Sequence, residues 1–336
     1  MVDSKAKVAV LSDLNNHRNL LTSILQRRGF KAFPLGQERV VTPIFPKRAA
    51  NVALASQGDA LTNGDVTVIQ GLDQCDLCLI DISGGISERL EVAIAQSHEL
   101  DIPTLFLDEH LPSGAQFLLA EIELKIVEKL LEIRAHAQHF RMNPEKTWFL
   151  AASTGGPEAV KAFVQNLLPN SDFAFLYAQH IDVGFESNLV TMLDGVQGYS
   201  AKIAASGEVL RPKSITIIPT HCQVRILPGG VVFLDDDPWQ GEFQPSINAS
   251  LLSFGKGCGY QGGCIVFSGM GDDGASGARL YKSLGGKVWA QSPESCIVSS
   301  MPSSVIDAQI TGTVDTPENL AKHLSASSFH NCAVAE

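Results

Sequence analysis

The chain has 336 residues, of which 45% are hydrophobic and 18% charged, and its formal net charge is −11 from 36 acidic against 25 basic residues. This composition is typical of a globular protein of two domains. The acidic balance, with no cluster of lysine or arginine, argues against nucleic acid and anionic membranes as partners. The start is no signal peptide, and no apolar run reaches the roughly 18 residues of a membrane span. We therefore expect a cytoplasmic protein without membrane insertion.

Residues 1–114 alternate strand and helix patterns, which predicts a parallel sheet covered by helices. Buried-type apolar runs mark the strands, and apolar residues spaced three to four apart mark the helices. The expected strands are 7–12, 31–34, 75–82 and 103–108, and the expected helices are 15–28 and 86–98. One long amphipathic helix is predicted over 115–139, ending at "RMNPEK". Residues 115–146 are therefore predicted to be a helical linker.

Residues 147–336 repeat the alternation and predict a second domain. Its expected strands are 148–153, 173–179, 214–219, 264–268 and 287–291, with a hairpin over 222–237. Its expected helices are 157–168, 185–193, 247–254, 278–284 and 317–324. The predicted fold class is α/β, with two doubly wound, mainly parallel sheet domains. In such sheets, ligands bind outside the carboxyl ends of the strands.

Three chemically active side chains lie at the carboxyl ends of expected strands of the second domain. Ser153 lies in "FLAASTGGPEAV", where two glycines and a proline lead into a helix. A serine in this position can cap the helix, cradle a phosphate or act as a nucleophile. His180 follows the next strand and is the first choice for a base, with His221 the second. Asp273 lies in a glycine turn and is well placed to orient a histidine.

The glycine turn "SGMGDDGASG" also fits a dinucleotide-binding fingerprint, because Gly269, Gly271 and Gly274 follow a strand and precede a helix. Glu294 lies close to where a ribose-binding acid is expected. The two aspartates in the turn argue against this interpretation, since they would repel a pyrophosphate.

The cysteines offer a weaker candidate for a metal or redox site. Cys75 and Cys78 form a C-x-x-C inside an expected strand, and Cys258 and Cys264 flank a glycine-rich turn. A zinc site needs matched ligand pairs on turns. Because these cysteines lie among buried-type residues, we expect free buried thiols.

Six stretches, taken in order, resemble the CheB family of chemotaxis protein-glutamate methylesterases. They are "ASTGGPEA", "QHIDVGF", "IIPTHCQV", "PSIN", "SGMGDDGASG" and "AQSPESCIVSSMP", within roughly residues 147–325. The resemblance implies that Ser153 is the nucleophile, His180 the base and Asp273, rather than Asp272, the third member of the triad. It implies a methylesterase catalytic domain over 147–336 that needs no metal and no cofactor for catalysis.

The resemblance also implies that Thr154 and the backbone N–H of Met270 line the site. Two positions depart from the usual pattern of the family. Ala151 stands where a glycine is common, and Gln244 stands where an arginine is common. Neither position belongs to the triad, but the second is expected to affect substrate docking.

The family usually carries an N-terminal receiver domain, and residues 1–114 resemble one in part. Asp81 ends a strand at the position of the phosphoacceptor, and Asp13 lies at that of a Mg²⁺ ligand. Ser12 replaces the second acid of the usual pair, and the fifth strand with its lysine is replaced by the long helix. We expect a degenerate receiver-like regulatory domain, with weak or no phosphorylation of Asp81 and Mg²⁺ bound only if phosphorylation is retained. The alternative is that Asp81 merely ends a strand.

The resemblance implies hydrolysis of glutamyl methyl esters on methyl-accepting chemotaxis receptors, in chemosensory adaptation. The implied partners are these receptors and a chemosensory histidine kinase, and the same chemistry would allow glutamine deamidation. Two alternatives stay open: a catalytically silent chemosensory adaptor, and a nucleotide-binding oxidoreductase that uses the glycine turn 269–274.

Overall fold

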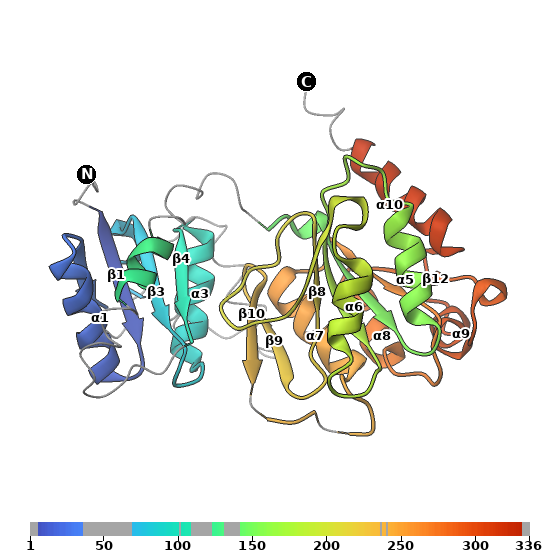
Figure 1. Ribbon diagram of the computed structural model, residues 1–336, viewed down its shortest axis with the longest axis horizontal. Coiled ribbons are helices and arrows are strands. Elements are labelled where there is room, and N and C mark those ends of the chain that lie inside the picture. The colour runs from blue at the N-terminus through green and yellow to red at the C-terminus, as the bar shows by residue number, and fades with distance from the viewer. Residues whose placement is uncertain are drawn as a thin grey trace, which may run out of the picture. The chain divides into compact units, whose positions relative to one another are not determined.

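The structure is a computed structural model that describes residues 6–35, 69–100, 102–108, 123–130, 142–235, 237–239 and 241–330. The chain forms two compact units, residues 1–140 and 141–336 (Figure 1). The boundary between them falls inside residues 115–146, and most of the helix predicted over 115–139 lies outside the described residues. Among the described helices, none combines the length and the apolar character that crossing a membrane requires.

The N-terminal unit is built on a parallel sheet of four strands in the order β2-β1-β3-β4. This is the beginning of the order 2-1-3-4-5 of flavodoxin-like doubly wound domains. Its elements are β1 (Lys7–Ser12), α1 (Asn15–Arg27), β2 (Lys31–Pro34), η1 (Leu72–Gln74), β3 (Leu77–Asp81), α3 (Glu88–Glu99) and β4 (Thr104–Leu107). The strands and helices predicted within the described part of residues 1–108 are confirmed to within two residues at each end.

Both faces of this sheet are covered, which explains its continuous apolar strands. Helices α1 and α3 lie on opposite sides of it (Figure 1). Residues 123–130 are helical, and their Ile126 and Leu130 are buried in the same core as Leu21 and Leu25 of α1. The described part of the predicted linker helix therefore packs on the N-terminal sheet.

The C-terminal unit is built on seven parallel strands in the order β13-β12-β11-β5-β6-β8-β7, with a separate antiparallel hairpin of β9 and β10. The strands are β5 (Thr147–Ala152), β6 (Ala174–Gln179), β7 (Ser200–Ile203), β8 (Ser214–Ile217), β9 (Gln223–Leu227), β10 (Val231–Asp235), β11 (Gly263–Val266), β12 (Lys287–Gln291) and β13 (Thr313–Asp315). The helices are α5 (Gly156–Gln165), α6 (Glu186–Leu193), α7 (Ile247–Cys258), α8 (Ala275–Ser283), α9 (Ser300–Asp307) and α10 (Pro317–His330). Short 3-10 turns are η2 (Pro144–Lys146), η3 (Val196–Gly198) and η4 (Pro293–Ser295).

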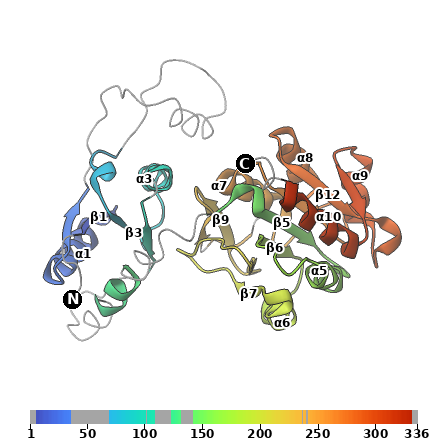
Figure 2. The ribbon, with the colours of Figure 1, turned by 90° about the horizontal axis from the view of Figure 1, so that it is seen from above.

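Two apolar cores lie on the two faces of this sheet. One core joins the sheet to α5, α6 and α10, with Phe163 and Leu324 among its buried residues. The other joins it to α7, α8, α9 and the hairpin, with Phe254 and Tyr281 buried. Figure 2 shows α5 and α6 on one side of the sheet and α7 and α8 on the other. This layering leaves the carboxyl ends of the strands to carry the candidate site.

The predicted α/β class with mainly parallel sheets is confirmed, and so is the hairpin turning at residues 228–230. Three elements, β7, α9 and β13, were not predicted from the sequence. Helix α8 was expected to start at 278 but begins at Ala275.

Candidate active site

Three of the predicted site residues lie at one edge of the seven-stranded sheet. Strand β5 pairs with β6 on one side and with β11 on the other. Ser153 directly follows β5, His180 directly follows β6, and Asp273 lies in the loop between β11 and α8. Because all three strands are parallel, their carboxyl ends meet at the edge where doubly wound sheets bind ligands.

Ser153 is buried, and its backbone is held on both sides. The Ser153 N–H donates to the carbonyl of Ser268 (3.1 Å). The Ser153 carbonyl accepts from the Gly156 N–H and from Gln179 Nε2 (2.8 Å each). These bonds fix the turn that carries the hydroxyl between the strand and α5.

The glycines after Ser153 have a steric reason. Gly155 has a φ of +78°, in the region that favours glycine. A Cβ on Gly156 would lie 2.5 Å from both the Cβ of Ala152 and Oε1 of Gln179. Pro157 is in the first turn of α5, where its missing N–H leaves no helical bond unmade. The sequence therefore allows a sharp turn from strand to helix directly after the serine.

His180 and Asp273 form a hydrogen-bonded pair. His180 Nε2 lies 2.9 Å from Asp273 Oδ2, and the carboxylate only accepts, so the Nε2–H is the donor. This leaves Nδ1 as the ring nitrogen that can take up a proton. No hydrogen bond joins His180 to Ser153 Oγ within the described residues. Such bonds are often long before substrate binds.

The first amides of α7 also bind Asp273. The N–H of Ile247 donates to Oδ2 (2.8 Å) and the N–H of Asn248 donates to Oδ1 (3.1 Å). Burial by itself raises the pKa of Asp273, but the hydrogen bonds from His180, Ile247 and Asn248 outweigh it and lower the pKa below its ordinary value. The carboxylate is therefore ionised and fixed at a helix N-terminus.

The loop between β11 and α8 also approaches the serine. A Cβ on Gly269 would lie 2.8 Å from Ser153 Cβ and would collide with Met301 Sδ. The amides on either side of Met270 are bound, Gly269 N–H to Val298 O and Gly271 N–H to Ser300 Oγ. The Met270 N–H has no partner in this described loop, and the Met270 side chain is 70% exposed.

Thr154 and His221 are the remaining candidates in this unit. The Thr154 carbonyl accepts a hydrogen bond from Ser268 Oγ (2.8 Å), which ties the residue after Ser153 to the end of β11. His221 is exposed in the segment before β9, and in the described part of the chain it makes no hydrogen bond to Ser153. His180, not His221, is the histidine that pairs with Asp273.

The loop after His180 is tied to the neighbouring strand through a buried acid. Glu186, at the start of α6, accepts from the N–H and Oγ1–H of Thr220 (2.8 and 2.5 Å) and from the Gly184 N–H (2.9 Å). Burial raises the pKa of Glu186, but these bonds outweigh it and lower the pKa below its ordinary value. This anchor holds the start of α6 against the segment after β8.

Phe243 is a neighbour of the pair that sequence reasoning missed. Its ring stacks on the imidazole of His180, with 5.1 Å between ring centroids and 9° between the planes. The residue lies in the segment before α7, 63 positions after His180 in the numbering, and nothing in the local pattern predicts the contact. Two signals from the family resemblance, the "PSIN" stretch and the departure at Gln244, indicated that this segment borders the site, but neither pointed to Phe243.

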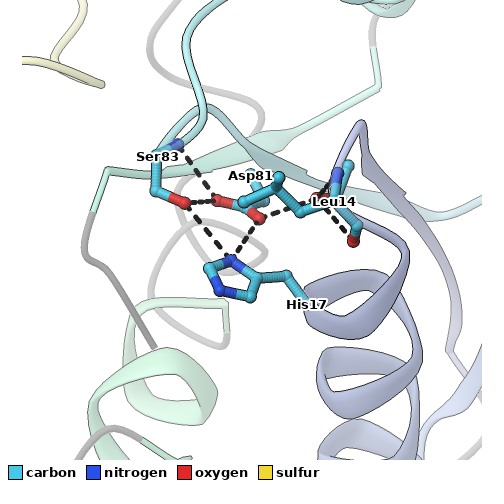
Figure 3. Close-up of polar contacts among 5 residues, drawn as sticks. Leu14, His17, Asp81 and Ser83 are labelled. Atoms are coloured by element: carbon cyan, nitrogen blue, oxygen red, sulfur yellow. Dashed lines mark hydrogen bonds and ion pairs between the residues drawn. The ribbon is translucent and has the colours of Figure 1, made fainter. Parts of the chain in front are cut away.

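The N-terminal unit carries a second polar cluster, around Asp81 at the end of β3 (Figure 3). Asp81 is buried and accepts four hydrogen bonds. Ser12 Oγ–H and His17 Nδ1–H donate to Oδ2 (2.8 and 3.0 Å). The N–H and Oγ–H of Ser83 donate to Oδ1 (3.1 and 2.6 Å). The carboxylate is therefore fully engaged by the protein itself.

The residues at this place do not fit a Mg²⁺ ion. Asp13 is paired with Arg89 (3.3 Å), and His17 occupies one oxygen of Asp81. Mg²⁺ requires a near-octahedral set of oxygen ligands. No group of three or more His, Cys, Asp or Glu side chains suited to a metal ion occurs among the described residues.

The cysteines within the described residues are free thiols. Cys78, Cys258 and Cys264 are buried, and burial raises the pKa of each of these thiols well above its ordinary value. Cys75 lies in the turn before β3 and donates to the Gly71 carbonyl (3.2 Å). The expectation of free buried thiols is confirmed for Cys78, Cys258 and Cys264, whereas Cys75 is half-buried.

Comparison with known proteins connects this edge of the sheet to one family. Residues 148–324, just over half of the chain, match the profile of a family described as CheB methylesterase. This range contains all six quoted stretches. A protein-glutamate methylesterase/protein-glutamine glutaminase of Rhizobium meliloti is 31% identical over 177 residues, which cover 53% of this chain and 50% of the relative.

Two further comparisons agree with this match. A protein-glutamate methylesterase/protein-glutamine glutaminase of Pseudomonas syringae pv. tomato is 30% identical over 200 residues, covering 56% of this chain and 51% of that protein. The crystal structure of the Thermotoga maritima CheB methylesterase catalytic domain has a TM-score of 0.51 and 29% identity, over 54% of this chain and 98% of that chain. The matches thus span about half the length of these curated relatives.

Proposed function

This chain belongs to the CheB methylesterase family, and on that basis we propose that it hydrolyses glutamyl methyl esters of chemoreceptors in sensory adaptation. The observation that carries the proposal is the His180–Asp273 pair at the strand end next to that of Ser153. The names of the relatives combine methylesterase and glutaminase activity. We therefore include release of ammonia from receptor glutamines as a second reaction of the same site.

In the proposed mechanism, His180 Nδ1 takes the proton of the Ser153 hydroxyl as Oγ bonds to the ester carbonyl carbon. Asp273 holds the Nε2–H and stabilises the imidazolium that forms. The tetrahedral intermediate then breaks its bond to the methoxy oxygen, and His180 returns the proton so that methanol leaves. A water molecule, deprotonated by His180, cleaves the acyl-serine and restores the hydroxyl.

Backbone amides near Ser153 are the proposed oxyanion donors. The Met270 N–H has no other partner in its described loop, and α5 begins at Gly156, three residues after the serine. A single oxyanion donor is worth about 3 to 4 kcal/mol of transition-state stabilisation. Thr154 is proposed to line the same site. No metal or cofactor enters any of these steps.

Two partners belong to the proposal. The substrate is a methylated helix of a chemotaxis receptor, and a chemosensory histidine kinase is a proposed contact of the N-terminal unit. The alternative of a silent adaptor would keep this geometry without using it. The oxidoreductase alternative is disfavoured because Asp273 binds the amides of α7 from within the glycine turn, and its negative charge would repel pyrophosphate.

Methanol release from a methylated receptor tests the proposal. We expect Ser153→Ala to reduce the rate to the background of the uncatalysed reaction. Ser250→Ala is the matched control, because Ser250 is also buried and its Oγ has no hydrogen-bond partner among the described residues. Methanol release by Ser153→Ala at the wild-type rate would refute the proposed nucleophile. Micromolar binding of NAD(P) in equilibrium dialysis would revive the oxidoreductase alternative.

A further inference from the structure

The segment before α7 contacts both members of the His180–Asp273 pair. Phe243 stacks on the imidazole with nearly parallel ring planes. Four and five residues later, the amides of Ile247 and Asn248 bind the two oxygens of Asp273. Ser246 caps α7 by accepting from the Ala249 N–H (3.3 Å), which fixes the start of the helix. One segment thus contacts both residues: its amides bind the carboxylate oxygens of Asp273, and its phenyl ring covers one face of the His180 imidazole.

We propose that Phe243 is a positioning residue for His180, an inference that rests on the proposed function. The centroid distance of 5.1 Å is within the range of favourable offset stacking. With one face of the ring covered, rotation of the imidazole out of the plane of the Asp273 bond has to displace the phenyl ring. The stack therefore keeps Nε2 on Asp273 and leaves Nδ1 available to Ser153.

The stack has a second consequence once His180 is protonated. The face of an aromatic ring carries partial negative charge, so it attracts a cation placed against it. Phe243 thus favours the imidazolium in the same orientation in which Asp273 binds it. The ring also excludes water from one side of the pair, which strengthens the hydrogen bond to the carboxylate.

Three variants distinguish a role of Phe243 in positioning His180 from a role in binding the substrate. Phe243→Leu keeps an apolar side chain and removes the ring, whereas Phe243→Tyr keeps the ring. Phe185→Leu is the matched control, because Phe185 is exposed in the loop after His180 and makes no ring contact within the described residues. A small misplacement of a catalytic group costs up to roughly 100-fold in rate. We expect kcat of Phe243→Leu to fall roughly 10- to 100-fold with KM unchanged.

Further readouts distinguish this inference from a structural role and from the proposed function. The acid limb of the kcat pH profile should shift in Phe243→Leu and return in Phe243→Tyr. Carbethoxylation of His180 by diethyl pyrocarbonate, mapped by mass spectrometry, should be faster in Phe243→Leu whether or not the esterase proposal holds. An unchanged carbethoxylation rate, or a rise in KM alone, would overturn the positioning role.

A separate observation, in the N-terminal unit, carries a second inference. Asp81 accepts four hydrogen bonds from Ser12, His17 and Ser83, and Asp13 is paired with Arg89. We infer that this pocket is closed by its own side chains, with His17 and Arg89 engaging the two carboxylates that a receiver would direct at Mg²⁺. The unit would then act without Mg²⁺ and without phosphorylation of Asp81.

The sign of one stability change tests this second inference. In an open acidic pocket, replacing a carboxylate by an amide relieves repulsion and raises Tm. In a closed pocket, Asp81→Asn turns an acceptor into a donor that faces His17 or Ser83, so Tm should fall by several degrees. Asp13→Asn is the control, because its carboxylate is partly exposed and such pairs contribute little.

Two measurements on the full chain complete the test. We expect no Mg²⁺ binding at millimolar concentration in calorimetry. We also expect no phosphoryl adduct in the intact mass after incubation with phosphoramidate and Mg²⁺. A stoichiometric acyl phosphate mapped to the peptide of Asp81, or a higher Tm for Asp81→Asn, would overturn the inference.

Discussion

Replacing Asp273 by asparagine perturbs the His180–Asp273 pair at the carboxylate, whose Oδ2 accepts two hydrogen bonds. Oδ2 accepts from His180 Nε2 (2.9 Å) and from the Ile247 N–H (2.8 Å), while Oδ1 accepts from the Asn248 N–H (3.1 Å). Asparagine has the same shape, but one of its two positions becomes an NH₂ group. Every orientation of the amide therefore sets this NH₂ against at least one backbone N–H.

Both orientations lose at least one hydrogen bond to a buried charged group, which is worth about 1.5 to 3 kcal/mol. We expect the free energy of unfolding to fall by about 2 kcal/mol. If the NH₂ group faces Nε2, it also forces the imidazole into the tautomer that carries its proton on Nδ1. That tautomer cannot accept the serine proton, and the same exchange in a serine protease triad lowers kcat roughly 10⁴-fold.

Methanol release measured beside chemical denaturation tests this prediction. Asp272→Asn is the matched control, because Asp272 is the adjacent, exposed aspartate. We expect Asp273→Asn to lose roughly three to four orders of magnitude in kcat and Asp272→Asn to stay near wild type. Equal effects of the two substitutions on kcat would refute the role assigned to Asp273.

Three further predictions follow from particular contacts. Gly269→Ala should lower kcat, because the added Cβ would lie 2.8 Å from Ser153 Cβ. An unchanged kcat would show that the loop between β11 and α8 can move away from Ser153 without affecting catalysis. The pKa of Glu186 is lower in the folded chain than its ordinary value of about 4.3, so the ionised carboxylate stabilises the fold. This stabilisation is complete at pH values above the ordinary pKa and is lost as the pH falls through the lower pKa of the folded chain. The free energy of unfolding should therefore fall less steeply with decreasing pH in Glu186→Gln than in the wild type. Identical curves for the two proteins would count against the role of Glu186 as a buried, ionised anchor. Leu130→Ala should cost about 2 to 5 kcal/mol of unfolding free energy, against little for the exposed Leu124→Ala, because Leu130 is in the N-terminal core. Similar costs for both leucines would contradict that packing.

The strands that carry the candidate site could be predicted because they are buried on both faces. Strands β5, β6 and β11 are continuous apolar runs, and the glycine-rich turns after β5 and β11 mark their ends. Parallel pairing then brings the residues after them to one edge, which is why Ser153, His180 and Asp273 could be grouped in advance. Of the three, the structure joins His180 and Asp273 directly.

The elements that were missed have weak local signals. Helix α9 begins within a run of serines and carries Pro302 in its first turn, so its composition resembles a loop. Strands β7 and β13 are edge strands of four and three residues, whose pairing depends on the neighbouring strand rather than on their own pattern. Tertiary context, not propensity, forms these elements.

The finer geometry of both polar clusters depends on contacts between distant segments. Phe243 reaches His180 through the segment before α7, and His17 reaches Asp81 from the first turn of α1. The sequence indicates that the lysine of a receiver is missing, but His17 and Arg89 were not identified from it as partners of the carboxylates. The available signal was their position, in the first turn of a helix that follows a strand end.

Covalent labelling of Ser153 by a fluorophosphonate probe tests the central claim most directly, because it needs no knowledge of the receptor. We predict one adduct per chain, mapped to Ser153, abolished by Ser153→Ala and slowed by His180→Gln, with Ser250→Ala labelled as fast as wild type. Absence of label on Ser153 in the folded full chain, or labelling that is indifferent to His180, would contradict a nucleophile activated by the His180–Asp273 pair.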